Sequence, residues 1–352
     1  MNKIIDLRSD TVTKPTEKMR DAIRNAEVGD NVMGEDKTVQ QLEERCKDIF
    51  QKEDAMFVVS GTMANQIVVM SQCQRGDQII VSNRSHIYNL EVAGISATSG
   101  VQPRAVHSPG GCFNLINLKK EIHKADIQRA PTVMICLENT FDLNRGLVTP
   151  ADCIDELCSF VKPYGVFVYL DGARIFNAAI ASNLPVSRIC KHVDAVAFCL
   201  SKGLACPIGS ILLGDKDFIE KAKRMRQRLG GGWRQAGIIA AAGIVALNEM
   251  IERLSEDHKH AKILATRLRG LGLGIDLEQV QTNIVYLDLS TLGIDANYFV
   301  EKLSHLGIKV KPVEEKAVRM VTHKDISRDD IDIVLNSISN FISQEKLMKN
   351  KV

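Results

Sequence analysis

The sequence lacks the features that mark membrane, secreted and nucleic-acid-binding proteins. No charge-free apolar run is long enough to span a bilayer, and the start MNKIIDLRSD carries charges where a secretory signal needs an apolar stretch. A formal net charge of +2 provides no excess of positive charge for binding a polyanion. We therefore expect a cytoplasmic protein with no membrane and no nucleic-acid partner.

Metal-binding cysteine patterns are also absent. The nine cysteines are an odd number, are scattered through apparent strands and helices, and form no close groups with histidine. We therefore predict no metal site and expect buried, reduced thiols such as Cys46 and Cys136. Cys73 and Cys206 lie nearer to predicted loops, which leaves open a reactive thiol at either position.

The chain length favours one large and one small domain, because 352 residues exceed the size of a single small core. We predict an N-terminal arm over 1–15, a large domain over 16–245 and a smaller α+β domain over 246–352. The long apolar segment Ala236–Leu254 is expected to link the two domains.

Short apolar runs alternate with amphipathic segments through the predicted large domain. Strands are expected near 55–59, 78–81, 132–137, 166–170, 195–200 and 210–213. This alternation favours the α/β class, a mostly parallel sheet with helices on both faces. In the small domain, strands are expected near 284–287, 309–312 and 317–321.

Asp171 and Lys202 are the strongest candidates for chemistry. Asp171 ends the apolar run VFVYLD, and Lys202 follows the next run, AVAFCLS. Both are therefore expected at carboxyl ends of strands, the edge where open α/β sheets bind ligands. Pyridoxal phosphate needs a lysine to form a Schiff base and a carboxylate to keep its pyridine nitrogen protonated. Taken singly, a helix-capping aspartate and a solvated loop lysine are the better interpretations.

A third segment adds a candidate phosphate site. SGTMAN, at Ser60–Asn65, follows another apolar run, and its small residues open a helix whose backbone N–H groups can bind a phosphate. By itself the segment indicates only a helix cap. The three features together favour a pyridoxal-phosphate enzyme in which Lys202 carries the cofactor.

Through these residues the chain resembles the threonine aldolases, pyridoxal-phosphate enzymes of the β-eliminating lyase group with the aspartate-aminotransferase-like type I fold. The matching blocks extend from DLRSDTVT at 6–13 to RMVTH at 319–323. Between them lie SHI at 85–87, LENT at 137–140, DGARIFNA at 171–178, SKGL at 201–204 and GGGWRQAG at 230–237. The resemblance implies the same fold, with a large cofactor-binding domain and a smaller C-terminal domain.

The resemblance implies a cofactor site made of five residues. Gly61 and Thr62 hold the phosphate, His86 stacks on the pyridine ring, Asp171 meets the ring nitrogen and Lys202 forms the covalent bond. For His86 alone, a loop histidine with satisfied hydrogen bonds is an equally good interpretation. The implied catalytic residues are Lys202, His86 and Asp171, with no metal.

The resemblance also implies a substrate site. Ser9, Arg174 and Arg319 bind the substrate carboxylate, because a planar guanidinium grips a carboxylate with two N–H groups. Arg174 is also implied to contact the cofactor. Arg234 in GGGWRQ is implied to approach the phosphate, which can belong to a neighbouring subunit. Surface charges remain the alternative interpretation of Arg319 and Arg234.

Three segments depart from the family pattern. Phe141 and Asp142 follow LENT where many members have His-Asn, Gln128 stands where histidine is common, and Met33 where tyrosine is common. All three segments are expected to border the substrate side chain. Because glutamine cannot act as a general base, His86 or a bound water must take the β-hydroxyl proton. We hypothesise that Phe141 favours a bulky or aromatic β-substituent.

Together these features predict an aldehyde-lyase that cleaves L-threonine, L-allo-threonine or related β-hydroxy-α-amino acids to glycine and an aldehyde. Two alternatives stay open, a pyridoxal-phosphate-dependent β-eliminating lyase on another amino acid and a non-catalytic cofactor or amino-acid binder. A nicotinamide dehydrogenase is disfavoured, because the glycines 230–232 follow a basic helix rather than opening one. The resemblance further implies a homodimer or homotetramer with active sites at the dimer interface.

Overall fold

The computed structural model describes residues 3–349, and the chain divides into two compact units. One unit is Pro15–Ile251, and the other combines the chain up to Lys14 with the chain from Glu252 onward. Each unit has its own hydrophobic core. Among the residues described, no helix has the length and apolar character needed to cross a membrane.

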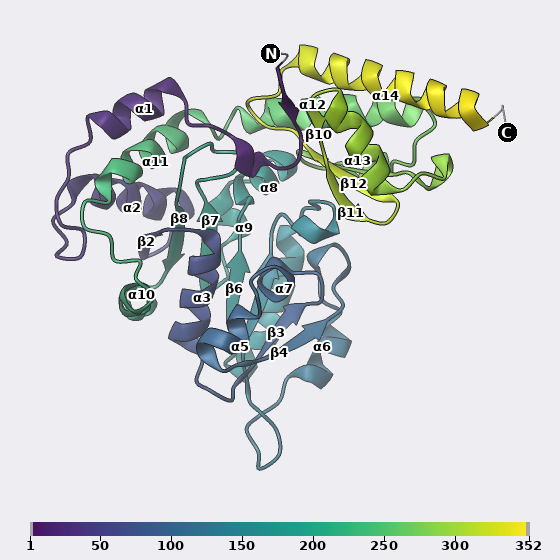
Figure 1. Cartoon of the computed structure of the whole chain (residues 1–352). Coiled ribbons are helices and arrows are strands. Elements are labelled where there is room, and N and C mark those ends of the chain that lie inside the picture. Colours follow the sequence, from purple (N-terminus) through teal and green to yellow (C-terminus); the bar gives the residue numbers. More distant parts are fainter. Residues whose placement is uncertain (1–2, 350–352) are drawn as a thin grey trace. The chain divides into compact units, whose positions relative to one another are not determined.

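The unit 15–251 is built on a seven-stranded sheet in the order β2-β8-β7-β6-β5-β3-β4 (Figure 1). Its strands are β2 Asp54–Val58, β3 Gln78–Ser82, β4 Gln102–Val106, β5 Thr132–Glu138, β6 Phe167–Asp171, β7 Ala195–Cys199 and β8 Ser210–Gly214. Strand β8 is antiparallel to both of its neighbours, and the other pairings are parallel. The prediction of a mostly parallel α/β sheet is therefore confirmed.

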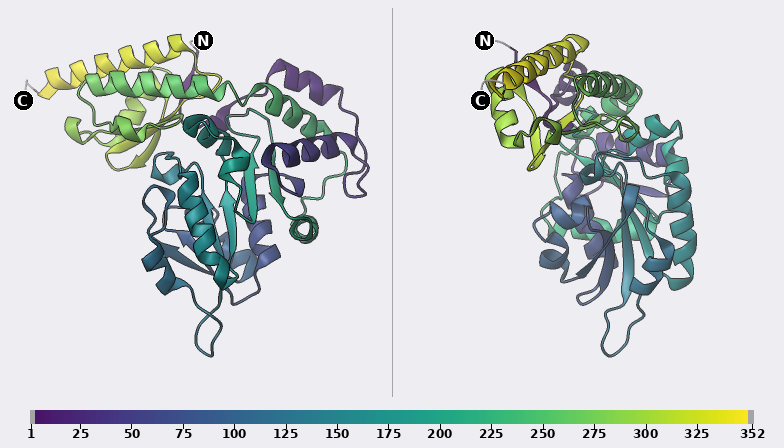
Figure 2. Two further views of the ribbon diagram at one scale, coloured as in Figure 1. Left: turned by 180° about the vertical axis from the view of Figure 1, so that it is seen from behind. Right: turned by 90° about the vertical axis from the view of Figure 1, so that its right-hand side faces the viewer.

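Helices cover both faces of this sheet (Figure 2). The helices of this unit are α1 Glu17–Arg24, α2 Lys37–Phe50, α3 Gly61–Gln72, α4 His86–Asn89, α5 Gly94–Ser99, α6 Leu115–Glu121, α7 Ala151–Val161, α8 Ile175–Ser182, α9 Val186–Ile189, α10 Lys216–Arg228 and α11 Gly237–Glu249. Successive strand residues point to opposite faces. On β7, Ala197 faces the core shared with α3 and α10, whereas Phe198 stacks on Phe50 of α2 at 5.0 Å between ring centres. Both faces are therefore buried, which explains the unbroken apolar runs in the sequence.

The second unit is a smaller α+β structure. Strands β9 Ile284–Asp288, β11 Lys311–Glu314 and β12 Ala317–Val321 form an antiparallel sheet, and β1 Ile5–Asp6 pairs with β10 Ile308–Lys309. Its helices are α12 Leu254–Gly270, α13 Ala296–His305 and α14 Arg328–Lys349. Ile5 and Leu7 are buried in this unit's core, so the N-terminal arm belongs to it by packing. The segment predicted as the link, 236–254, contains all of α11 and the first residue of α12.

The structure corrects part of the cysteine prediction. Cys46 and Cys136 are free and buried, as predicted, but Cys112 and Cys153 are joined as a disulfide. Burial raises the pKa of Cys73 to about 12 and raises that of Cys206 further still. These shifts disfavour a reactive thiolate at either position, because a thiol reacts as its thiolate.

Candidate active site

The candidate site is a cavity of about 180 Å³ at the carboxyl edge of the seven-stranded sheet. Chain segments that follow β2, β3, β5, β6 and β7 all contribute to its lining. Six residues predicted from the sequence line it together: Gly61, Thr62, His86, Asp171, Arg174 and Lys202. The parallel arrangement explains this convergence, since the carboxyl ends of parallel strands meet at one edge.

The first turn of α3 forms one wall of the cavity. The hydroxyl of Ser60 accepts the N–H of Met63 at 3.1 Å and caps the helix. A side chain at Gly61 would bring its Cβ within 2.8 Å of the sulfur of Cys199, so glycine is required for this close approach. The remaining first-turn N–H groups have no partner within the helix and can bind an anion.

Asp171, at the end of β6, is held by two donors. Its Oδ1 accepts the N–H of Ala173 at 3.1 Å, and its Oδ2 accepts Nδ2 of Asn65 at 2.9 Å. The hydroxyl of Tyr169 donates to Oδ1 of Asn65 at 2.6 Å, which fixes the orientation of that amide. Asp171 is therefore locked in place before any ligand binds.

His86, the first residue of α4, is paired with a buried carboxylate. Its Nδ1 lies 2.9 Å from Oε1 of Glu91, whose side chain is completely buried. Glu91 also accepts Nδ2 of Asn65 at 2.6 Å and Nε2 of Gln66 at 2.8 Å. The hydrogen bond to Glu91 is the main cause of a raised pKa of His86, reinforced by the nearby charge of Asp171. The network thus orients the ring and increases its basicity.

Glu138, the last residue of β5, joins two segments that border the cavity. Its Oε2 accepts the N–H of His86 at 2.7 Å, and its Oε1 accepts the N–H of Asp142 at 2.9 Å. Burial raises the pKa of Glu138, and the carboxylate of Asp171 raises it further. Glu138 therefore fixes both the start of α4 and the loop after LENT.

Arg174 carries positive charge into the cavity wall. Its side chain is only 2% exposed, and its Nη1 lies 3.5 Å from Oδ2 of Asp142. Asp142 lines the same cavity. The Arg174 guanidinium is suited to binding a carboxylate ligand, and it already contacts the carboxylate of Asp142.

The ligand atoms of His86, Glu91 and Asp171 lie within 4.8 Å of one another, a spacing that a metal ion could bridge. In the structure the amide of Asn65 bridges the two carboxylates instead, and Glu91 accepts from His86. These bonds account for the arrangement as a hydrogen-bonded support for Asp171 and His86.

The remaining predicted site residues do not belong to the chain segments that line this cavity. Ser9 and Arg319 belong to the second unit, where Nη2 of Arg319 donates to the carbonyl of Arg8 at 3.4 Å. Arg234 is outside the cavity lining, 55% exposed, with its Nη1 3.0 Å from Oδ2 of Asp30. The roles assigned to Ser9, Arg319 and Arg234 stay predictions.

The three departures from the family pattern differ in their surroundings. Met33 and Gln128 are exposed, and neither lines the cavity. Phe141 is buried at 1% exposure and is also outside the lining, whereas Asp142 lines it. The hypothesis that Phe141 contacts a bulky β-substituent therefore has no support in the geometry, and Asp142 becomes the residue of interest.

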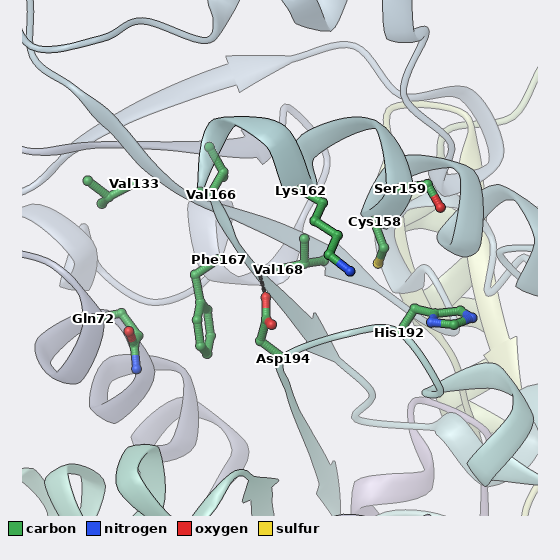
Figure 3. A pocket seen from close by; sticks show the side chains of 11 residues that line it. Gln72, Val133, Cys158, Ser159, Lys162, Val166, Phe167, Val168, His192 and Asp194 are labelled. Carbon is green, nitrogen blue, oxygen red and sulfur yellow. Dashed lines mark hydrogen bonds between the residues drawn. The ribbon is translucent and has the colours of Figure 1, made fainter.

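A larger cavity of about 660 Å³ lies at the opposite edge of the sheet, beside the amino-terminal halves of β5 and β6 (Figure 3). Its lining includes Val133, Phe167, Lys162, His192 and Asp194. Asp194 accepts the N–H of Val168 at 2.7 Å, so its carboxylate serves the strand edge. This cavity has greater volume, but it has neither the cofactor lysine candidate nor a helix N-terminus with a capping motif.

Comparison with known proteins identifies the family. The sequence profile of the family described as Beta-eliminating lyase matches residues 6–291. The chain belongs to this family. It is 42% identical over 340 residues to a probable low-specificity L-threonine aldolase 2 of Arabidopsis thaliana, covering 95% of this chain and 96% of the relative. It is also 38% identical to the low specificity L-threonine aldolase of Escherichia coli strain K12, covering 93% and 96%.

Solved structures agree on the fold of the family. A threonine aldolase of Leishmania major superposes with a TM-score of 0.83, at 16% identity, covering 96% of this chain and 99% of that one. A serine palmitoyltransferase of Sphingomonas wittichii, at 15% identity, superposes with a TM-score of 0.77. The predicted type I fold and the resemblance to threonine aldolases are both confirmed.

Pyridoxal phosphate is the cofactor of this family, and the cavity fits it. Gly61 opens space at the start of a helix, where a phosphate can bind. Asp171 and Lys202 supply the carboxylate and the amine that the cofactor requires. Among the described residues, the hydroxyl of Thr140 is buried without a hydrogen-bond partner in this lining, so a polar ligand atom there would satisfy it.

Sequence reasoning missed four residues of the site: Asn65, Glu91, Glu138 and Asp142 as a partner of Arg174. Asn65 was within the SGTMAN block, four residues after Gly61 and so on the same side of α3. Glu91 had no clear signal. It is followed by Val92 and Ala93, whose φ angles of 52° and 55° lie in a region that residues other than glycine rarely adopt.

Proposed function

We propose that the protein cleaves L-threonine, L-allo-threonine or related β-hydroxy-α-amino acids to glycine and an aldehyde. The observation that carries the proposal is one cavity lined by Lys202, Asp171, His86 and Arg174 together. The activity named for the relatives of Arabidopsis and Escherichia coli supports it, because both cover nearly the whole chain.

Three parts of the cavity would hold the cofactor. Lys202 would supply the amine that holds the cofactor covalently, Asp171 would keep its ring nitrogen protonated, and the N–H groups at Gly61 and Thr62 would bind its phosphate. When bound, pyridoxal phosphate supplies an electron sink for the pair left on Cα. Asn65 keeps the Asp171 carboxylate aimed, since it donates directly to Oδ2.

The remaining residues act on the substrate. Arg174 binds the α-carboxylate and thereby orients the bonds at Cα. His86 takes the proton of the β-hydroxyl as the Cα–Cβ bond breaks, the β-oxygen becomes the carbonyl of the aldehyde, and a proton added to Cα gives glycine. Glu91 stabilises the protonated ring through Nδ1. We also assign Ser9 and Arg319 to carboxylate binding.

We further propose a homodimer or homotetramer with active sites at the dimer interface, to which Arg234 of a neighbouring subunit contributes, and a cytoplasmic location. The segment after His86 supports an interface near the cavity, because Tyr88, Leu90 and Val92 are 40%, 47% and 94% exposed. Light scattering on the purified protein tests the assembly. A monomer would contradict it.

Product analysis separates this function from the alternatives. With L-threonine, L-allo-threonine and L-phenylserine, the proposal predicts glycine and the matching aldehyde in equal amounts. With L-serine and L-cysteine, a β-eliminating lyase would give pyruvate and ammonia. A protein that binds pyridoxal phosphate and amino acids but forms neither set of products would be a binder.

A further inference from the structure

Asp142 is placed unusually for a residue of a carboxylate-binding cavity. It lines the cavity together with Arg174, and their side chains are 13% and 2% exposed. Oδ2 of Asp142 lies 3.5 Å from Nη1 of Arg174. The guanidinium proposed for the substrate carboxylate therefore already has an anionic partner within the chain.

The loop that carries Asp142 is firmly anchored. The N–H of Asp142 donates to Glu138 at 2.9 Å, and the same carboxyl accepts the N–H of His86. The N–H of Phe141 donates to the carbonyl of Leu147 at 2.8 Å, and a β-bridge joins these two residues. The backbone of Asp142 is therefore fixed beside Arg174.

Charge explains why such a partner is useful. A buried guanidinium without a counter-ion is strongly destabilising, so Asp142 stabilises Arg174 while the cavity holds no substrate. When a substrate binds, its α-carboxylate approaches the guanidinium that already contacts the Asp142 carboxylate. The two negative charges repel each other, because the site is partly dehydrated.

We propose that Asp142 is the resident counter-ion of Arg174, and that the α-carboxylate of an amino-acid substrate competes with it. This inference rests on the proposed function for the identity of the substrate. The competition weakens the binding of the substrate α-carboxylate to Arg174 and leaves the binding of the other substrate groups unchanged. Because the backbone N–H of Asp142 is tied to Glu138, the exchange is a movement of the Asp142 side chain.

The test is the Asp142→Asn variant, which keeps the shape and removes the charge. Dissociation constants for glycine and for 2-aminoethanol, which lacks the carboxylate, are measured on the cofactor-loaded protein by the change in cofactor absorbance. Glycine is expected to bind on the order of tenfold more tightly to the variant. The affinity for 2-aminoethanol stays the same, and KM for L-threonine falls.

The matched control is Asp152→Asn. Oδ1 of Asp152 lies 3.0 Å from Nη2 of Arg188 on the surface, so this variant makes the same change of charge outside the cavity and leaves glycine affinity unchanged. A second variant, Asp142→Ala, removes the charge without adding the hydrogen-bonding groups of asparagine. It is also expected to bind glycine more tightly than the wild-type protein.

Unchanged or weaker glycine binding in both Asp142 variants would overturn the proposal, because Asp142 would then position Arg174 rather than compete for it. Equal tightening for 2-aminoethanol would overturn it as well, since the effect would not depend on the carboxylate. A wild-type protein that binds glycine but fails to cleave L-threonine would contradict the proposed function and still leave the Asp142 comparison decisive.

Discussion

The cavities at the two edges of the seven-stranded sheet differ in volume, in charged side chains and in the hydrogen bonds that hold those side chains. The smaller cavity is the candidate active site, because its charged side chains are held by buried partners. The amino edge has the larger cavity, about 660 Å³, yet Asp194 there serves a strand N–H. The carboxyl edge has about 180 Å³, and its Asp171 and His86 are each held by further buried side chains. The same strands β5 and β6 contribute to both cavities. Their direction explains the difference, because chain reversals at the carboxyl ends bring polar residues and a helix N-terminus together.

The largest contrast is expected between two lysines. Lys202→Ala removes the amine proposed to bind the cofactor, so glycine formation from L-threonine is expected to fall by about 10⁴-fold or more. Lys162→Ala, in the cavity of the amino edge, leaves the rate within about twofold. The measurement is kcat/KM for both variants. Equal losses would mean that the two edges had been assigned wrongly.

The two histidines give the next contrast. His86→Ala removes the proposed base and lowers kcat for L-threonine by about 10²–10⁴-fold, whereas His192→Ala has little effect. Steady-state assays with aldehyde detection measure both. Full activity in His86→Ala would contradict the assignment of His86 as the base and would mean that water or another group takes the proton.

A smaller effect is expected from the support of His86. The neutral ring accepts the proton, so kcat/KM rises as the pH passes upward through the pKa of His86. Glu91 is the main cause of the raised pKa. In Glu91→Gln the rise therefore moves to lower pH. The pH profile of kcat/KM measures this shift, with Asp194→Asn as the control. If kcat/KM rises at the same pH in Glu91→Gln as in the wild-type protein, Glu91 does not control the protonation of the catalytic base.

The smallest effect concerns a carboxyl outside both cavities. Glu43 on α2 accepts the N–H of Phe57 at 2.8 Å, and burial raises its pKa to about 7. The folded state thus binds more protons than the unfolded state between pH 4.5 and 7, so this group's stabilisation is complete below pH 4.5 and is lost as the pH rises through about 7. Because the side chain is partly exposed, we expect a change in unfolding free energy across this window smaller than the roughly 3 kcal/mol that the full shift would give. Denaturant unfolding at several pH values should show that the free energy of unfolding falls less with rising pH in Glu43→Gln than in the wild-type protein. Catalysis should be unchanged.

The sequence predicted the fold, and it predicted that the candidate cofactor residues lie at strand ends, because both depend on local patterns. Asp171 and Lys202 follow apolar runs directly, and their positions at strand ends follow from the parallel sheet. Gly61 and Thr62 begin a helix after a strand in the same way.

The supporting residues depend on packing that no local pattern records. Glu91, between α4 and α5, accepts hydrogen bonds from Asn65 and Gln66 of α3, about 25 residues earlier in the chain. The pairing of Asp142 with Arg174 joins two loops after different strands, 32 positions apart in the sequence. Phe141, its neighbour, was expected to line the cavity, but strand-like pairing with Leu147 buries it.

The most direct test of the central claim is the visible spectrum of the purified protein with pyridoxal phosphate, before and after borohydride reduction, together with an assay of glycine from L-threonine. The account predicts a cofactor absorption band, covalent fixation to the peptide containing Lys202, and release of glycine and acetaldehyde. A protein that shows no band even with added cofactor, or that fixes the cofactor at a lysine other than Lys202, would contradict it.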